Sequence, residues 1–320
     1  MKHFLSNRIQ AIPESGIRAF FDLVLNSEGI ISLGVGEPDF LTPWAIRDEA
    51  IYRLEKGRTS YTSNKGLLEL RQAICNYLRD RFFIHYSPES VLITNGVSEG
   101  VDIVLRAILN DGDEVILPEP AYVCYRPLIQ LAGGVVRSVD TSGADFMVTA
   151  SAIEAEISDK TKAIILSYPN NPTGQSIDFD ELKKIAAIAK ARDCLIITDE
   201  IYADLSFDKF QSIATIEFIK DQLVYLNGFS KAHSMTGWRV GYVCAPSEFI
   251  DEINKIHQYS ALCAPTVSQY AAIEACQSTQ ADVDRMRQSY LERAQYFTRQ
   301  MNHIGLATLM PTSPANASSS

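Results

Sequence analysis

Four polar clusters that could carry chemistry each stand at the end of an apolar, β-branched run. They are TNGVSEG after residues 91–94, SYPNNPTG at the end of 163–167, ITDEIY at the end of 194–198, and LNGFSKAHSMTGWRVGY at the end of 223–227. In an open α/β sheet, ligands bind at the carboxyl ends of the strands. We therefore expect the four clusters to meet at one edge of a sheet and to form a single ligand site.

The first two clusters offer neutral donors. Gly96 permits a tight turn into a helix, where the amides of Val97 and Ser98 would point toward an anion. The alternative is an ordinary strand–helix turn, because one glycine turn is a weak signal. Asn171, in the second cluster, offers an amide donor to a ligand oxygen, although Asn, Pro, Thr and Gly also make ordinary turns.

The last two clusters carry charge. Asp199 stands at the end of a strand with Tyr202 three residues later, and its carboxylate could hold a cationic ring nitrogen. Alternatively, Asp199 caps the next helix and Glu200 is solvated. Lys231 lies in a small polar loop, eight residues before Arg239. A loop lysine is usually a surface charge, whereas an amine that attacks carbonyls must be partly unprotonated, which burial beside another cation achieves.

The elements around these clusters alternate between strand and helix. Strands without polar alternation, such as AIIL and LIIT, are typical of a sheet covered on both faces, so we predict a doubly wound, mainly parallel α/β fold with seven strands. The predicted strands are Val91–Thr94, Glu114–Leu117, Gly134–Val139, Ala163–Ser167, Cys194–Thr198, Leu223–Asn227 and Val240–Cys244. The predicted helices include Glu99–Leu109, Tyr122–Leu131, Ala150–Ile157, Asp180–Ala191, Pro246–His257 and Asp282–Ile304.

The chain is predicted to divide into an N-terminal arm (1–40), a large α/β domain (41–280) and a linking helix with the start of a small domain (281–320). Gly305 is expected to end the linking helix as a left-handed cap. The apolar run 306–310 then leads into a Pro/Ser/Ala tail and resembles an unfinished strand.

Composition excludes several classes of protein. With 46% hydrophobic and 21% charged residues and a formal net charge of −10, the chain is typical of a globular protein without a nucleic-acid surface. We find no apolar stretch near the roughly 18 residues of a membrane span and no secretory signal. The six cysteines form no CxxC pair and no Cys/His cluster at zinc spacing, so we expect reduced thiols, no metal site and a cytoplasmic location. Cys124 and Cys263 could be reactive thiols, although buried structural cysteines are the commoner case.

Taken together, these segments resemble a known family. SLGVGEPDF, TNGVSEG, EPAYVCY, YPNNPTG, TDEIY and FSKAHSMTGWRVGY are similar to the class I/II aminotransferases of fold type I, which use pyridoxal 5'-phosphate. The intervals also match, with 28 residues from Asn171 to Asp199 and 32 from Asp199 to Lys231. The resemblance runs from about residue 5 to about residue 310. ESGIR and HSMTGW resemble the branch of aspartate, aromatic and N-acetyl-diaminopimelate aminotransferases.

The resemblance implies roles at the cofactor ring. Lys231 would form a Schiff base with the cofactor aldehyde and shuttle the substrate's α-proton. Asp199 would pair with the ring nitrogen, and Tyr202 and Asn171 would donate to the ring's phenolate oxygen. Tyr122 would stack on the ring, with a core tyrosine in a helix as the alternative.

The resemblance also implies contacts at the phosphate, the substrate and a second subunit. Gly36 would let backbone approach the substrate carboxylate, and Tyr122 and Asn171 would also line the substrate site. Tyr61 would reach the phosphate of a neighbouring subunit's cofactor, so a homodimer with shared sites is implied. The groups implied to hold the phosphate are Ser230, Arg239, the Gly96 turn and the amides of Val97 and Ser98.

The implied activity is ping-pong transamination from an L-amino acid to a 2-oxo acid. Relatives add a later arginine that clamps the substrate carboxylate, whereas here no arginine follows Arg299 and the chain reads MPTSPANASSS from residue 310. Three explanations are open: a truncated or frameshifted product, a degenerate protein that binds cofactor without turnover, or replacement of the clamp by Arg18 or Arg126. We expect weak transamination and exposed apolar surface on 282–304. The alternative activities are β-elimination, as in carbon–sulfur lyases, and non-catalytic cofactor binding.

Overall fold

A seven-stranded sheet forms the centre of the computed structural model, which describes residues 2–13 and 36–314. The strands are β1 (Val91–Thr94), β2 (Glu114–Glu119), β3 (Val135–Asp140), β4 (Thr161–Ser167), β5 (Leu195–Asp199), β6 (Leu223–Gly228) and β7 (Gly241–Cys244). Their order is β1-β7-β6-β5-β4-β2-β3. β7 is antiparallel to both of its neighbours and the other pairs are parallel. The predicted mainly parallel sheet is therefore confirmed.

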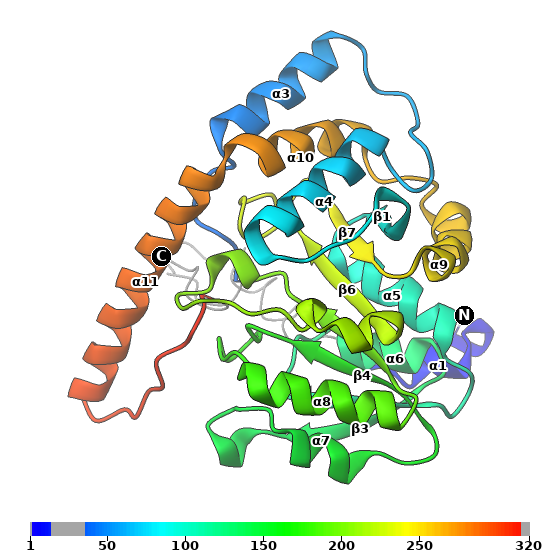
Figure 1. Cartoon of the computed structure of the whole chain (residues 1–320), viewed down its shortest axis with the longest axis vertical. Helices are drawn as coiled ribbons and strands as arrows, with labels where there is room; N and C mark the ends of the chain where they lie inside the picture. Colours follow the sequence, from blue (N-terminus) through cyan, green and yellow to red (C-terminus); the bar gives the residue numbers. More distant parts are fainter. Residues whose placement is uncertain (1, 14–35, 315–320) are drawn as a thin grey trace.

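Helices and short 3₁₀ turns surround the sheet (Figure 1). The α-helices are α1 (Asn7–Gln10), α3 (Trp44–Glu55), α4 (Leu68–Phe82), α5 (Val97–Ile108), α6 (Tyr125–Leu131), α7 (Ala150–Glu156), α8 (Phe179–Ala191), α9 (Ser247–Ser260), α10 (Thr266–Ser278) and α11 (Gln280–His303). The 3₁₀ turns are η1 (Lys2–Phe4), η2 (Pro88–Ser90), η3 (Ser142–Ala144), η4 (Ala203–Leu205), η5 (Ile213–Thr215) and η6 (Glu217–Gln222).

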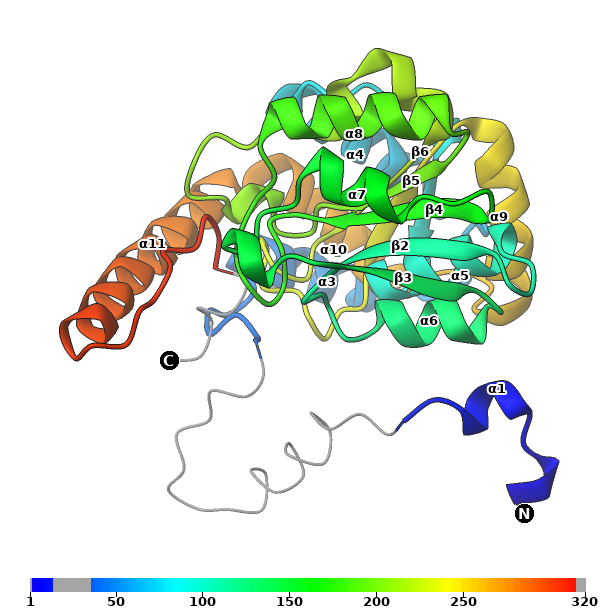
Figure 2. The ribbon, with the colours of Figure 1, turned by 90° about the horizontal axis from the view of Figure 1, so that it is seen from below.

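Helices cover both faces of the sheet, and successive side chains of a strand point to opposite faces. Ile196 joins the apolar cluster that contains α4, α7, α8 and α10, whereas Ile197 joins the cluster that contains α5, α6 and α9. Seen edge-on, α7 and α8 lie on one side of the sheet and α5 and α6 on the other (Figure 2). The double burial explains why the strand sequences lack polar alternation.

The predicted helices differ from the observed ones mainly at their starts. α5 begins at Val97, two residues before the predicted Glu99, and α6 begins at Tyr125, three residues after the predicted Tyr122. Tyr122 therefore precedes its helix, and the alternative of a core tyrosine within a helix is wrong. Helices α3, α4 and α10 are not among the predicted helices. α3 buries just Ile46 and Ala50, so its apolar pattern is weak.

α11 ends as predicted, in a left-handed glycine cap. Gly305 has a φ of 85°, its N–H donates to the carbonyl of Asn302, and the N–H of Leu306 donates to the carbonyl of Met301. This pair of bonds is a Schellman motif. As expected, aromatic side chains near the end of α11 are exposed, namely Tyr296 and Phe297.

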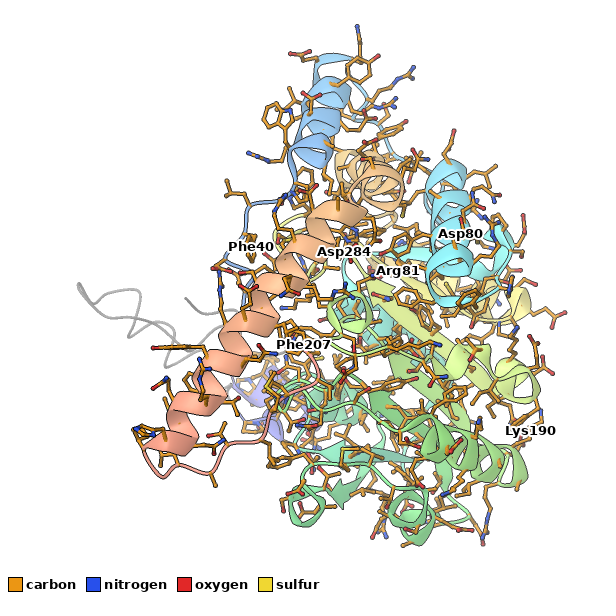
Figure 3. The ribbon with its side chains drawn as sticks, turned by 60° about the vertical axis from the view of Figure 1, so that its left-hand side comes forward. Phe40, Asp80, Arg81, Lys190, Phe207 and Asp284 are labelled. Carbon is orange, nitrogen blue, oxygen red and sulfur yellow. The ribbon has the colours of Figure 1, made fainter. Side chains whose placement is uncertain are left out.

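The buried face of α11 packs against a small apolar cluster beside the sheet. Val283, Met286 and Tyr290 contact Leu205 and Ala232 there. Figure 3 shows Phe40 and Phe207 beside the same helix, and both pack against this cluster.

The segment after α11 returns to the sheet domain. The N–H of Thr312 donates to the carbonyl of Gly174 (2.8 Å), and the N–H of Phe207 donates to the carbonyl of Thr312 (2.8 Å). Ser313 is buried. Residues 311–314 therefore pack on the turn that follows β4, although their composition resembles that of a tail.

The carboxyl ends of the central parallel strands meet at one edge. Ser167 of β4 pairs with Asp199 of β5, and Asp199 pairs with Leu226 of β6. The turn from β1 into α5 reaches the same edge through β7, because Gly241 lies against Gly96. Within residues 2–13 and 36–314, every helix is too short or too polar to cross a membrane.

The close approach of Gly241 to the turn before α5 predicts a stability effect. A Cβ at Gly241 would lie 2.8 Å from the carbonyl carbon of Gly96 and 2.8 Å from the nitrogen of Val97. We expect Gly241→Ala to lower the free energy of unfolding by about 1–3 kcal/mol, measured by chemical denaturation. Gly237→Ala is the control, since nothing lies within 4 Å of its Cβ. Equal effects of the two substitutions would contradict the close approach.

Candidate active site

A cavity of about 590 Å³ opens at the carboxyl edge of the sheet. Its volume lies within the range that small-molecule and cofactor sites occupy. The sequence-predicted residues that line it are Gly36, Val97, Ser98, Tyr122, Asn171, Asp199, Tyr202, Ser230, Lys231 and Arg239. The fold therefore brings together residues from all four polar clusters, and Gly96 adjoins them at the start of α5.

One end of the cavity is suited to an anion. Gly96 is the N-cap of α5 with a φ of 77° and no side-chain cap, so the first amides of the helix are open to a ligand. The Arg239 guanidinium lies over this turn and donates to the carbonyls of Thr236 (3.0 Å) and Asn95 (3.2 Å). A Cβ at Gly96 would come within 2.6 Å of that guanidinium, so glycine is needed for the approach.

A buried carboxylate stands at another wall of the cavity. The Asp199 carboxylate accepts a bond from the Tyr125 hydroxyl (2.7 Å) and one from the amide of Ile201 (3.2 Å). Burial raises the pKa of Asp199 to about 6, although these two bonds and the charge of Lys231 oppose the rise. A cationic group placed beside this carboxylate would stabilise its ionised form.

The amine of Lys231 lies in the same cavity. Its Nζ donates to the carbonyl of Gly36 (2.9 Å). Burial lowers the pKa of Lys231, and the nearby charge of Arg239 lowers it further, while Glu37 and Asp199 act in the opposite direction. The lowered pKa increases the fraction of unprotonated amine, which is the nucleophilic form. The structure thus places Lys231 in the wall of the cavity, partly buried, where the alternative was a surface charge.

Asn171 and Tyr202 meet beside this amine. The Nδ2 of Asn171 lies 3.5 Å from the hydroxyl of Tyr202, and the Nζ of Lys231 lies 5.7 Å from the centre of the Tyr202 ring. Burial raises the pKa of Tyr202 well above its ordinary value, so its hydroxyl keeps its proton. Both residues can therefore donate a hydrogen bond to a single ligand oxygen.

Two predicted aromatic residues lie in different surroundings. Tyr122 lines the cavity, and its ring meets that of Tyr125 edge-on at 5.7 Å between centroids. Tyr61 lies between α3 and α4, is 81% exposed and does not line the cavity. The single chain therefore does not bring Tyr61 to the site.

Several alternatives from the sequence are wrong. Asp199 caps no helix and faces the cavity, and Glu200 is wholly buried where a solvated side chain was one expectation. Arg126 is bound to Glu119 (2.8 Å) and does not line the cavity, so it is no carboxylate clamp there. Arg18 lies outside the described residues. Burial raises the pKa of the Cys124 thiol to about 12, which disfavours the thiolate that a reactive cysteine needs.

Two residues of this region were missed by the sequence analysis. Tyr125 binds Asp199 from the first turn of α6, and Glu200 binds a group of hydroxyls behind the cavity. Tyr125 precedes Ile129 by four residues, and both are buried on one face of α6, so this helical spacing is the signal that could have marked Tyr125. No local pattern marks the partners of Glu200, because they come from separate parts of the chain.

Known proteins resemble this chain in sequence and in fold. The family model "Aminotransferase class I and II" matches residues 28–315. The chain is 48% identical to the putative aminotransferase YugH of Bacillus subtilis, over 97% of this chain and 81% of that protein. It is 42% identical to the probable N-acetyl-LL-diaminopimelate aminotransferase of the same organism, over 98% and 79%. The structure of the aspartate aminotransferase from Thermus thermophilus with maleate matches with a TM-score of 0.93 at 32% identity, over 97% and 83%.

The family model covers most of the chain, and the relatives match it nearly from end to end. The mainly parallel sheet with its flanking helices is that of fold type I. The chain therefore belongs to the class I and II aminotransferases, enzymes that use pyridoxal phosphate to move an amino group between an amino acid and a 2-oxo acid.

Proposed function

We propose that the cavity residues hold pyridoxal phosphate in one orientation, with its phosphate at the start of α5 and its ring nitrogen at Asp199. The open amides of Val97 and Ser98, Ser230 and the Arg239 guanidinium suit a phosphate. The buried Asp199 carboxylate suits a protonated ring nitrogen. The opposite charges of these two groups, both facing one cavity of about 590 Å³, are the observation that carries the proposal.

The remaining residues have roles in proton transfer and orientation. When bound, pyridoxal phosphate supplies a ring that accepts the electron pair left by loss of the substrate's α-proton. The Lys231 amine would hold the cofactor through its aldehyde and, when free, would accept and return a substrate α-proton. Asp199 would keep the proton on the ring nitrogen, and Asn171 and Tyr202 would donate to the ring's phenolate oxygen. Tyr122 would pack against the ring, and the backbone at Gly36 would face the substrate.

Lys231→Ala tests the catalytic assignment. We expect the variant to lose at least about 10³-fold in the rate of amino transfer to 2-oxoglutarate, because both the nucleophile and the proton carrier are removed. Lys183→Ala, on the exposed surface of α8, is the matched control and should keep full activity. Borohydride reduction followed by peptide mapping should place the cofactor on the peptide that contains Lys231. Label on another peptide would refute the assignment.

The same assay separates the alternative activities. Release of pyruvate and ammonia from cysteine-type substrates without any 2-oxo acid would favour β-elimination. A cofactor absorbance that no amino acid shifts would favour non-catalytic binding. Transfer that depends on a 2-oxo acid supports the proposed reaction.

The pKa of Asp199 predicts how cofactor affinity depends on pH. Below about pH 6 the carboxyl of the cofactor-free protein is protonated and must lose its proton to pair with a cationic ring nitrogen. Affinity should therefore fall about fivefold from pH 6 to pH 5, because the ionised fraction of the carboxyl falls from about a half to about a tenth. The Asp199→Asn variant should bind the cofactor more weakly at pH 7, and its affinity should not show the part of the fall that protonation of Asp199 causes. Protonation of the cofactor itself affects both proteins equally, so the comparison cancels it. Spectroscopic titration measures both affinities, and parallel pH profiles would contradict the pairing.

We also propose that the active unit is a homodimer, with Tyr61 reaching the phosphate site of the partner subunit. Large apolar side chains around α3 and the following segment are exposed in the single chain. The most exposed of them are Leu41 (77%), Trp44 (61%) and Tyr61 (81%). Neighbouring apolar residues of this kind are typical of a protein interface.

Mixing two variants tests the shared site. Tyr61→Phe should weaken cofactor binding at least about tenfold, because a hydrogen bond to a charged group is lost, and should leave the dimer mass unchanged. A dimer mixed from Tyr61→Phe and Lys231→Ala subunits contains one site with both wild-type residues. We therefore expect mixing to restore tight covalent binding in up to half of the sites of mixed dimers. If cofactor binding by the mixture is merely the average of binding by the two variants alone, Tyr61 does not contribute to the partner's site.

The substrates and the location complete the proposal. The first L-amino acids to screen, each with a 2-oxo acid acceptor, come from the names of the relatives. These names are aspartate, aromatic-amino-acid and N-acetyl-LL-diaminopimelate aminotransferase. All six cysteines are unpaired, and free thiols persist in a reducing compartment, which supports a cytoplasmic location.

A further inference from the structure

A second carboxyl lies behind the cavity, on the opposite face of the sheet from Asp199. Asp199 ends β5 and Glu200 follows it directly, so their side chains point to opposite sides. Asp199 faces the cavity, where it meets Tyr125. Glu200 is 0% exposed and lies outside the cavity lining. A wholly buried carboxyl is costly unless other groups compensate it.

Three hydroxyl groups converge on one oxygen of this carboxyl. Oε1 of Glu200 accepts bonds from Tyr168 (2.8 Å), Ser212 (2.9 Å) and Thr198 (3.1 Å). The Tyr168 hydroxyl also accepts a bond from the amide of Ile213 (2.8 Å). These donors come from the end of β4, the end of β5 and the segment before η5, so Glu200 links three parts of the chain.

Two of these parts carry the proposed cofactor contacts. Tyr168 directly follows β4 and stands three residues before Asn171, while Thr198 and Glu200 flank Asp199. The amide of Tyr168 also donates to the carbonyl of Asp199 (3.2 Å). A movement of the turn after β4 relative to the end of β5 would therefore break both this backbone bond and the bond from Tyr168 to Glu200.

We propose that Glu200 is a positioning residue that, through Tyr168, fixes the turn bearing Asn171 relative to the strand end bearing Asp199. The inference rests on the proposed roles of Asn171 and Asp199 at the cofactor ring. Glu200 itself touches neither cofactor nor substrate. Its effect on the reaction is to set the distance between Asn171 and Asp199, which contact the same ring from different elements.

The properties of the carboxyl agree with a fixed, specific arrangement. Its second oxygen, Oε2, is buried without a hydrogen-bond partner among the described residues. Burial raises the pKa of Glu200 to about 7, and the charge of Asp199 raises it further, while the three hydroxyl bonds lower it. An acceptor that holds three donors at once defines their positions more narrowly than separate bonds would.

Tyr168→Phe, Glu200→Leu and the double variant test the inference. Each single substitution nearly preserves the side-chain volume. The first removes the hydroxyl that bridges Glu200 and Ile213, and the second removes the shared acceptor, which Gln would keep in its amide oxygen. Tyr225→Phe is the matched control, because the buried Tyr225 hydroxyl accepts a bond from Asn227 on the same face of the sheet and is not bonded to Glu200. The measurements are kcat, KM, the circular dichroism of the bound cofactor and the borohydride label on Lys231.

We expect both single variants to retain the Lys231 label. Their kcat should fall about tenfold with KM within about twofold, because misplaced contacts affect the reacting geometry more than binding. The cofactor's circular dichroism should lose about half its intensity, since it reports the orientation of the ring, and the double variant should fall no further than the singles. Tyr225→Phe should leave the dichroism within about a fifth of that of the unmodified chain.

Two results would overturn the inference. If Tyr168→Phe and Glu200→Leu lower the melting temperature but leave the cofactor's dichroism and kcat like those of Tyr225→Phe, then Glu200 has a structural role alone. Additive losses in the double variant would also show that the two residues act separately. A missing label on Lys231 in the unmodified chain is a different result, because it refutes the proposed function. If Glu200→Leu does not fold, Tyr168→Phe with its control still decides between the two outcomes.

Discussion

The site depends on keeping a carboxylate charged at a buried position. Asp199 is 4% exposed, yet its place at the end of β5 gives its carboxylate two donors, the Tyr125 hydroxyl and the amide of Ile201. These bonds limit the rise in pKa that burial alone would cause. The rest of the site is arranged around this charge: Lys231 approaches it from the loop after β6, and the cavity separates it from Arg239 at the start of α5.

The fold supplies this arrangement with few specialised residues. The carboxyl ends of parallel strands lie at one edge of the sheet, so polar residues that are far apart in the chain meet there. The antiparallel β7 then brings Gly241 against the Gly96 turn and places Arg239, just before that strand, over the first amides of α5. Glycines at both positions allow an approach that a side chain would block.

The sequence predicted those parts of the structure that depend on local pattern. Uninterrupted apolar runs marked the strands, and polar clusters at their ends marked the residues that line the cavity. It failed where tertiary contacts decide. Glu200 gives no local sign of its burial, because the hydroxyls that bind it include those of Tyr168, just after β4, and of Ser212, before η5. Tyr125 was missed because its partner, Asp199, lies 74 residues away in the chain.

The segment around Thr312 joins two turns that flank the cavity, since its N–H binds the carbonyl of Gly174 and its carbonyl receives the N–H of Phe207. Gly174 follows Asn171 by three residues, and Phe207 follows Tyr202 by five. The amide protons of Phe207 and Thr312 can therefore exchange with deuterium in the solvent when this segment detaches, and both report the same local opening. In this way backbone hydrogen bonds attach the residues beyond the last helix to the two turns that present Asn171 and Tyr202.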